Sequence, residues 1–238
     1  FNQKVSAWDT STITDMSYMF YNASTFNRAL NSWNLAGTST TSNMFNGAIA
    51  FNQPLSLWSM SSITDLSHMF ASTMAFNQDL STWNLSAATT LAYMFADSEA
   101  FNSNTNWTTT TSVANMSHIF DGATTYNQLL TTLDTTAVTD MSYMFNDAVG
   151  FNKTVGALAI PVLNNAVNIF TGSSMSTTNY SKTLQSWVNQ ATVPTNVLNV
   201  GGVDYNSSGQ VYITQLINTY GWTFATGSLI GSATFTYI

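Results

Sequence analysis

A period of 25 residues is the feature that most constrains how this chain can fold. The dipeptide FN begins at Phe1 and recurs every 25 residues as far as Phe151, with Tyr126 replacing Phe once. A second marker, MF or IF, ends at Phe20 and recurs with the same spacing as far as Phe170. A fixed period of this length is typical of solenoids, whose repeats pack on their neighbours. We therefore expect seven coils over residues 1–175 and number each repeat from the Phe or Tyr of this dipeptide.

Two sets of apolar positions predict the content of each coil. Positions 5, 8 and 10 form an LxxLxL pattern, which reads Leu30, Trp33 and Leu35 in the second repeat and alternates as a short strand does. Positions 13, 16, 19 and 20 are also apolar, and their spacings of three and four favour a short helix that Thr or Asp at position 14 or 15 would cap. The sequence predicts a leucine-rich-repeat-like α/β solenoid, with one short parallel strand and one short helix per coil. Its Trp and Phe side chains should stack from coil to coil.

The repeat stops after residue 175. Residues 179–190 predict an amphipathic helix with Tyr180, Leu184 and Trp187 inward, and a second helical stretch ends at Gly221. Because the last coil would expose its core, we expect residues 176–226 to form a small α/β capping module. We expect residues 227–238 to form a strand leading out of the cap towards a further module. Phe1 falls inside a repeat, so we also expect more coils upstream and a longer, secreted precursor whose signal lies outside this chain.

Charged residues are scarce, which excludes several classes of partner. The chain has 4 basic and 11 acidic residues and a net charge of -7. The basic residues Lys4, Arg28, Lys153 and Lys182 are scattered, so they offer no patch for a phosphate backbone, and we expect no nucleic-acid partner. Cysteine is absent, which leaves no thiolate metal site. No apolar run reaches the roughly 18 residues that a membrane span needs.

The sequence offers few groups for catalysis, and we expect no enzyme activity, no cofactor and no metal site. His68 and His118 both occupy position 18 and lie two coils, about 10 Å, apart, which is too far to share one metal ion. We interpret them as part of an exposed polar stripe. Asp15, Asp65 and Asp140 share position 15, where helix capping is favoured over a weak calcium site or glycosidase chemistry. The repeated Asn at position 2 predicts a hydrogen-bonded ladder between coils, with ligand contact as the alternative.

The strand side, at positions 7, 9 and 11, is the surface that we expect to bind a partner. Its residues are mostly small and polar, and Asp9, Asn34, Asn84 and Asp134 occupy position 9. Such a face can hydrogen-bond to sugars or to another protein, or it can be plain solvated sheet. In the fifth repeat the Trp moves from position 8 to position 7 as Trp107. Either a local bulge returns its ring to the core, or the ring stands outward between Asn84 and Asp134 as a stacking platform for a ligand.

The repeats resemble those of a known family. WDTSTITDMSYMF at residues 8–20 and WSMSSITDLSHMF at residues 58–70 are similar to the 25-residue repeats of BspA-type leucine-rich-repeat surface proteins. VGGVDY and LINTYGWTF are similar to the segment that closes such arrays. The resemblance implies an extracellular or cell-surface protein that mediates adhesion or binds a protein or glycan. The alternative is a structural subunit or spacer of a surface filament, coat or anchored complex, with other subunits as its partners.

Overall fold

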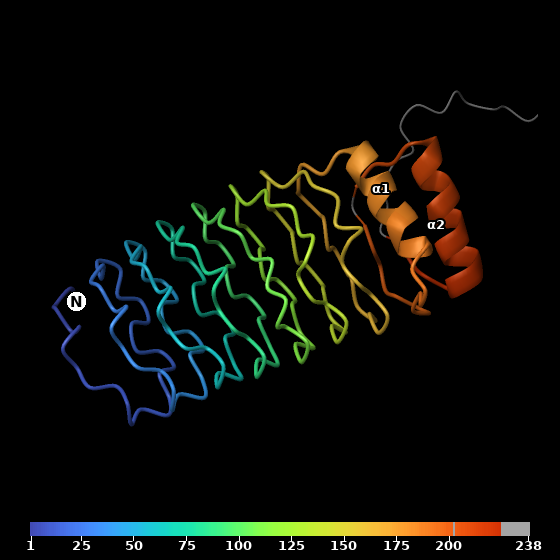
Figure 1. Cartoon of the computed structure of the whole chain (residues 1–238). Helices are drawn as coiled ribbons and strands as arrows, with labels where there is room; N and C mark the ends of the chain where they lie inside the picture. Colours follow the sequence, from blue (N-terminus) through green and yellow to red (C-terminus); the bar gives the residue numbers. More distant parts are fainter. Residues whose placement is uncertain (202, 225–238) are drawn as a thin grey trace, which may run out of the picture.

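The chain forms an elongated stack of coils with two helices at one end. The computed structural model describes residues 1–201 and 203–224. The amino terminus lies at the end of the stack opposite to helices α1 (Thr177–Val188) and α2 (Ser207–Tyr220), which pack against each other (Figure 1). Residues 227–238, predicted as a strand, lie outside the described residues.

The predicted α/β coil, with one strand and one helix per repeat, is wrong. Within residues 1–175 the structure contains no helix and no extended strand, and each coil is a series of turns. Isolated parallel β-bridges join position 15 of each coil to position 15 of the next, beginning with Asp15 to Thr40 and ending at Asn165. The C-terminal segment likewise has two helices and isolated bridges in its described part, where strands were expected. Single bridges, not a sheet, align the coils.

Left-handed backbone at positions 18 and 22 explains why the predicted helix does not form. All seven residues at each of these positions have positive φ, for example 60° at Tyr18 and 55° at Asn22. An α-helix needs φ near -60° at every residue, so two left-handed residues four apart prevent it. Consecutive turns therefore produce the spacings of three and four that the sequence presents as helical.

In the part of each coil where the helix was predicted, backbone N–H groups donate alternately to the next coil and to their own coil. The N–H groups of Phe20 and Asn22 donate to the carbonyls of Met44 and Asn46 in the next coil, at 2.9 and 2.7 Å. The N–H of Ala23 instead donates to the carbonyl of Phe20 and closes a turn. These bonds satisfy the backbone groups that a helix would have paired internally.

Position 15 stabilises a turn where helix capping was predicted. The Oδ1 atoms of Asp15, Asp65 and Asp140 each accept the N–H of the residue two further along the chain, at 2.8 Å. This is an Asx turn, in which a short polar side chain replaces a backbone acceptor. The predicted acceptor role is therefore correct, but the helix it was expected to start is absent from these coils.

The predicted strand at positions 8 to 10 is also absent, although its alternation is correct. Trp33 and Leu35 are buried, and Asn34 between them is exposed. Turns close on both sides, because Trp33 N–H donates to Leu30 and Thr38 N–H donates to Leu35, each at 2.9 Å. The extended run between these turns is too short to form a hydrogen-bonded ladder.

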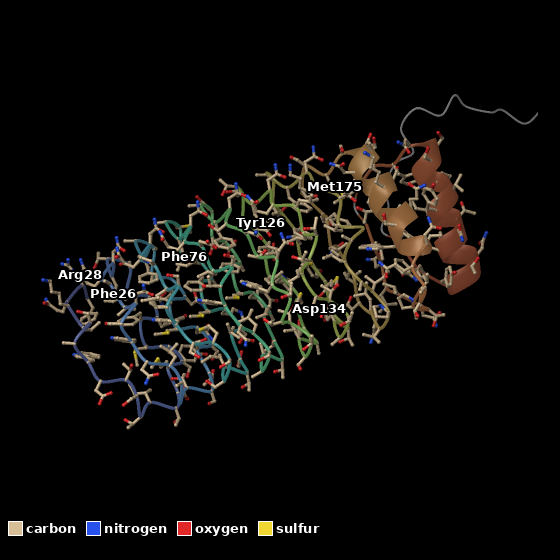
Figure 2. All side chains as sticks on the ribbon, in the orientation of Figure 1. Phe26, Arg28, Phe76, Tyr126, Asp134 and Met175 are labelled. Atoms are coloured by element: carbon tan, nitrogen blue, oxygen red, sulfur yellow. The ribbon has the colours of Figure 1, made fainter. Side chains whose placement is uncertain are left out.

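Two rows of aromatic rings run through the core, as predicted. Rings at position 1 stack on their equivalents with centroids 5.9 to 6.2 Å apart, and rings at position 20 do so at 5.4 to 5.9 Å. The Phe20 ring lies 4.0 Å from that of Phe26, so the two rows interlock. Such contacts contribute roughly 0.5 to 1.5 kcal/mol per pair beyond the burial of apolar surface. Figure 2 shows Phe26, Phe76 and Tyr126 following one another along the stack.

The asparagine ladder at position 2 is confirmed. From Asn2 to Asn127, each side-chain Oδ1 accepts the backbone N–H of the equivalent Asn in the next coil, at 2.9 to 3.1 Å. The last member, Asn152, accepts the N–H of Ser176, the N-cap of α1. The ladder therefore connects the coils to the first helix.

Helix α1 places aromatic side chains against the last coil. The ring centroids of Tyr180 and Trp187 lie 6.0 and 6.4 Å from that of Phe170. Trp222, which follows α2, lies 6.1 Å from Trp187, and Gly221 ends α2 with a φ of 70°. These contacts continue the aromatic core from the coils into the helical segment.

Candidate functional site

Trp107 lies in the core, so the hypothesis that its ring contacts a ligand is wrong. The side chain is 2% exposed, and its indole N–H donates to the carbonyl of Leu80 at 2.9 Å. In coil four the N–H of Trp83 donates to Leu80, three residues earlier, whereas the N–H of Trp107 donates to Thr105, two residues earlier, at 2.8 Å. The turn before Trp107 is therefore one residue shorter, which compensates for the shift of the Trp from position 8 to position 7 and keeps its ring in the core.

The other four predicted contacts lie on one side of the stack. Asp9, Asn34, Asn84 and Asp134 occupy position 9, and each Oδ1 accepts the N–H of the residue two further on, at 2.9 to 3.0 Å. Within the described residues, the second polar atom of each side chain, Oδ2 or Nδ2, has no hydrogen-bond partner. We call positions 7, 9 and 11 the turn face. In Figure 2, Asp134 lies on the lower side of the stack and Arg28 on the upper side.

Local hydrogen bonds also set the charge of the turn face. The hydroxyl of Ser11 donates to Asp9 Oδ1 at 2.6 Å, and the Ser11 N–H donates to the same oxygen at 2.9 Å. These two bonds, the hydroxyl first, lower the pKa of Asp9 below its ordinary value. Thr136 makes the same two contacts with Asp134, at 2.6 and 2.9 Å. The turn face therefore presents fixed acceptors and an ionised carboxylate at neutral pH.

A second feature, a row of stacked rings at position 18, was not identified from the sequence. His68, Tyr93, His118 and Tyr143 stack in consecutive coils, with ring centroids 4.1 to 4.5 Å apart and ring planes within 9° of each other. We call these four residues the ring row. Tyrosines and asparagines share position 18 with the two histidines, and the sequence predicted an exposed polar stripe there and not a stack of rings. A ring at the same position of four consecutive repeats was the available signal.

The backbone of the ring row is unfavourable for these residue types. Its φ values lie between 56° and 60°, a left-handed conformation that typically costs a non-glycine residue about 1 to 3 kcal/mol. Asn tolerates this conformation better, and coils two and seven carry Asn43 and Asn168 at the same position. The rings therefore occupy sites where the backbone alone favours Asn, and stacking between them offsets part of this cost.

Carboxylates surround the ring row. His118 Nδ1 lies 2.7 Å from Asp121 Oδ2. Burial lowers the pKa of His68, against an opposing effect of Asp65, so this imidazole is neutral at pH 7. Burial also raises the pKa of the Tyr93 phenol, and the carboxylate of Asp121 raises it further. The ring row thus combines stacked aromatic rings with nearby carboxylates.

The described part of the chain assembles neither a metal centre nor a membrane-spanning helix. Within residues 1–201 and 203–224, no three His, Asp or Glu side chains are grouped so that they could hold a metal ion. Neither described helix has the length and apolar character needed to cross a bilayer. The two sets of aligned surface side chains, the turn face and the ring row, are therefore the candidate sites.

Comparisons with known proteins assign a family but no activity. No curated protein and no solved structure matches the chain. A family model matches residues 1–107 and again residues 104–200, so the two matches cover the whole 25-residue array and helix α1. The chain belongs to the family described as "Mycoplasma protein of unknown function, DUF285".

Proposed function

We propose that this chain is a non-enzymatic binding module that holds a protein or glycan partner through its turn face. One observation carries the proposal: Asp9, Asn34, Asn84 and Asp134 adopt the same Asx turn, and each keeps one polar atom without an intramolecular partner among the described residues. Amide and carboxylate groups of this kind hydrogen-bond to the hydroxyls of sugars and to the backbone of proteins.

The rigidity of the stack supports this proposal. Each of these four side chains is fixed by a hydrogen bond within its own coil, and each coil is fixed to the next through the ladder that begins at Asn2. A partner would therefore meet polar groups whose conformational entropy is already lost, which reduces the free-energy cost of binding. Several weak contacts along one rigid face also act together, because the first contact raises the effective concentration for the next.

We propose a cell-surface or extracellular location for the same module. Its support is the resemblance of residues 8–20 and 58–70 to the repeats of BspA-type surface proteins, together with a surface of hydroxyls and amides that bears few charges. Adhesion to another cell or to a secreted protein is the role that fits such a face best.

A charge-neutral exchange on the turn face tests the proposal. In the double variant Asn84→Asp with Asp134→Asn, both side chains keep the Oδ1 acceptor of their turns and the net charge is unchanged. The atoms without a partner are exchanged, however: residue 84 loses the donor Nδ2 and gains an acceptor, and residue 134 loses the acceptor Oδ2 and gains a donor. Purified protein is applied to a glycan array and to cultured cells, and binding of the identified partner is then measured for each variant.

We expect the double variant to bind its partner about 3- to 30-fold more weakly, which corresponds to losing one or two hydrogen bonds. Tyr93→Asn, on the ring row, is the matched control and should leave this binding unchanged. Equal binding by wild type and the double variant contradicts the proposal. Light scattering adds a second check, because concentration-dependent assembly that the double variant does not alter would favour a structural subunit.

A further inference from the structure

The ring row lies in the most acidic part of the molecule. Positions 15 to 24 of the repeats carry seven of the eleven acidic residues: Asp15, Asp65, Asp97, Glu99, Asp121, Asp140 and Asp147. They carry no lysine or arginine, because the four basic residues lie elsewhere: Lys4, Arg28 and Lys153 at positions 3 and 4, and Lys182 in α1. Most of the negative charge therefore lies in a part of the coils that carries no lysine or arginine.

Three of these carboxylates influence the rings. Asp121 contacts His118 at 2.7 Å, Asp65 raises the pKa of His68 against the larger effect of burial, and Asp121 and Asp140 add to the effect of burial in raising the pKa of Tyr93. Within the described residues, none of these three carboxylates forms an ion pair with a lysine or arginine. The groups that contact them belong to the coils themselves: Asp65 accepts from Ser67 N–H, and Asp121 pairs with His118 and accepts from Asn146 Nδ2.

The central rings of the row expose only their edges. Tyr93 and His118 are covered on both faces by neighbouring rings at 4.1 to 4.5 Å, so solvent reaches only their edges. The four rings are partly exposed, and the side chain of His118 is 18% exposed. A phenol oxygen accepts hydrogen bonds, as does an unprotonated imidazole nitrogen. A row of aromatic edges beside carboxylates that have no lysine or arginine partner combines negative charge for a cation with ring edges against which its alkyl stem can pack.

We propose that the ring row, with Asp65, Asp121 and Asp140, is a binding site for a basic polypeptide segment. Lysine and arginine fit both features of this surface, because their charged heads pair with carboxylates while their alkyl stems pack on aromatic surface. Nucleic acid would be repelled by the same carboxylates, and a neutral glycan would make no use of them. The site is distinct from the turn face, and the inference does not rest on the function proposed for that face.

Labelled oligopeptides provide the test. Fluorescein-labelled nona-arginine and nona-lysine are titrated with the full chain, and binding is followed by fluorescence anisotropy at low and at physiological salt, with nona-glutamate as the negative probe. The variants are Tyr93→Asn and Asp121→Asn, and the matched control is Asp134→Asn, which removes one carboxylate from the turn face. Asn is the residue that coils two and seven carry at position 18, so Tyr93→Asn retains a backbone conformation that the fold already accepts.

We expect both basic peptides to bind wild type, and Tyr93→Asn and Asp121→Asn each to weaken binding about three- to fivefold or more. Asp134→Asn should change binding less than about twofold, because its carboxylate lies on the other face. If Asp134→Asn weakens peptide binding as much as Asp121→Asn does, the net charge of the protein explains the binding, and the proposed site is wrong. Unchanged binding by Tyr93→Asn, with a melting curve confirming folded protein, would exclude the rings.

Discussion

Thr105 and Tyr126 form a buried hydrogen bond between coils five and six, with their hydroxyl oxygens 2.7 Å apart. Both residues depart from the repeat. Tyr126 replaces the Phe found at position 1 of the six other coils, and Thr105 replaces the Leu or Val found at position 5. Both side chains are fully buried, so either hydroxyl alone would lack a partner in the core. The two departures are therefore a single compensated change, and burial raises the pKa of Tyr126 far above its ordinary value.

Thr105→Val should destabilise the protein by about 1 to 3 kcal/mol, because it preserves the shape of the side chain but leaves the Tyr126 hydroxyl unpaired. Tyr126→Phe should have a similar effect through the Thr105 hydroxyl. The double variant should recover most of this loss, since it removes both polar groups together. Urea unfolding of the four proteins gives the coupling free energy. Additive effects of the two substitutions would show that the hydroxyls do not depend on each other.

Tyr93→Asn should cost the fold little, even though it removes two ring contacts. Asn is well suited to the left-handed backbone of Tyr93, which has a φ of 60°, so the relief of strain offsets the lost stacking. Tyr93→Val should be more destabilising by about 1 to 3 kcal/mol, because a β-branched side chain is strongly disfavoured there. Thermal melting of both variants measures the difference. Equal melting temperatures would mean that backbone strain at position 18 is unimportant.

Gly122→Ala should destabilise the fold by more than about 1 kcal/mol. A Cβ atom at Gly122 would lie 2.4 Å from Asp97 Oδ1, and its φ of 66° also disfavours a side chain. Gly37→Ala is the control, because the nearest atom to its Cβ, the carbonyl oxygen of Ser11, is 3.4 Å away. Melting temperatures should fall for the first variant and change little for the second. Similar melting of both alanine variants would contradict the packing of the Asp97 side chain over Gly122.

The period, the core and the asparagine ladder could be predicted because each depends on side-chain type at a fixed position. A Phe that recurs every 25 residues in a solenoid stacks on its equivalent, as the rings at positions 1 and 20 do, whereas Trp58 and Trp83 lie beside Phe45 and Phe70. The same reasoning predicted the alternation of Trp33, Asn34 and Leu35, which the structure retains without forming a strand. Side-chain burial, in other words, was encoded more clearly than backbone hydrogen bonding.

The local backbone could not be predicted from apolar spacing alone. Consecutive turns and a helix both place residues three and four apart on one side, so Ile63, Leu66 and Met69 fit either. The signal that distinguishes them is weaker: Asn, Asp, Ser or Gly at position 22, and Asn43 or Asn168 at position 18. Tyr18, Tyr93 and Tyr143 hide this signal at position 18, because Tyr seldom adopts positive φ. The ring row was missed because the recurrence of Tyr and His at this position was interpreted as a polar stripe and not as a stack.

Stability should fall as the pH decreases from about 7.5 to 5.5, and His68 should account for part of the fall. Burial lowers the folded-state pKa of His68 below its ordinary value of 6.5, so the unfolded chain takes up this proton at a higher pH than the folded chain. At pH 7.5 the imidazole is neutral in both states and makes no contribution. Below pH 6.5 the unfolded state is favoured by its extra proton, until the folded imidazole also protonates. His68→Asn removes this group and keeps a residue suited to the left-handed backbone. Melting temperatures at the two pH values should therefore decrease less for His68→Asn than for wild type. An equal decrease in the two proteins would mean that burial of His68 is not linked to stability.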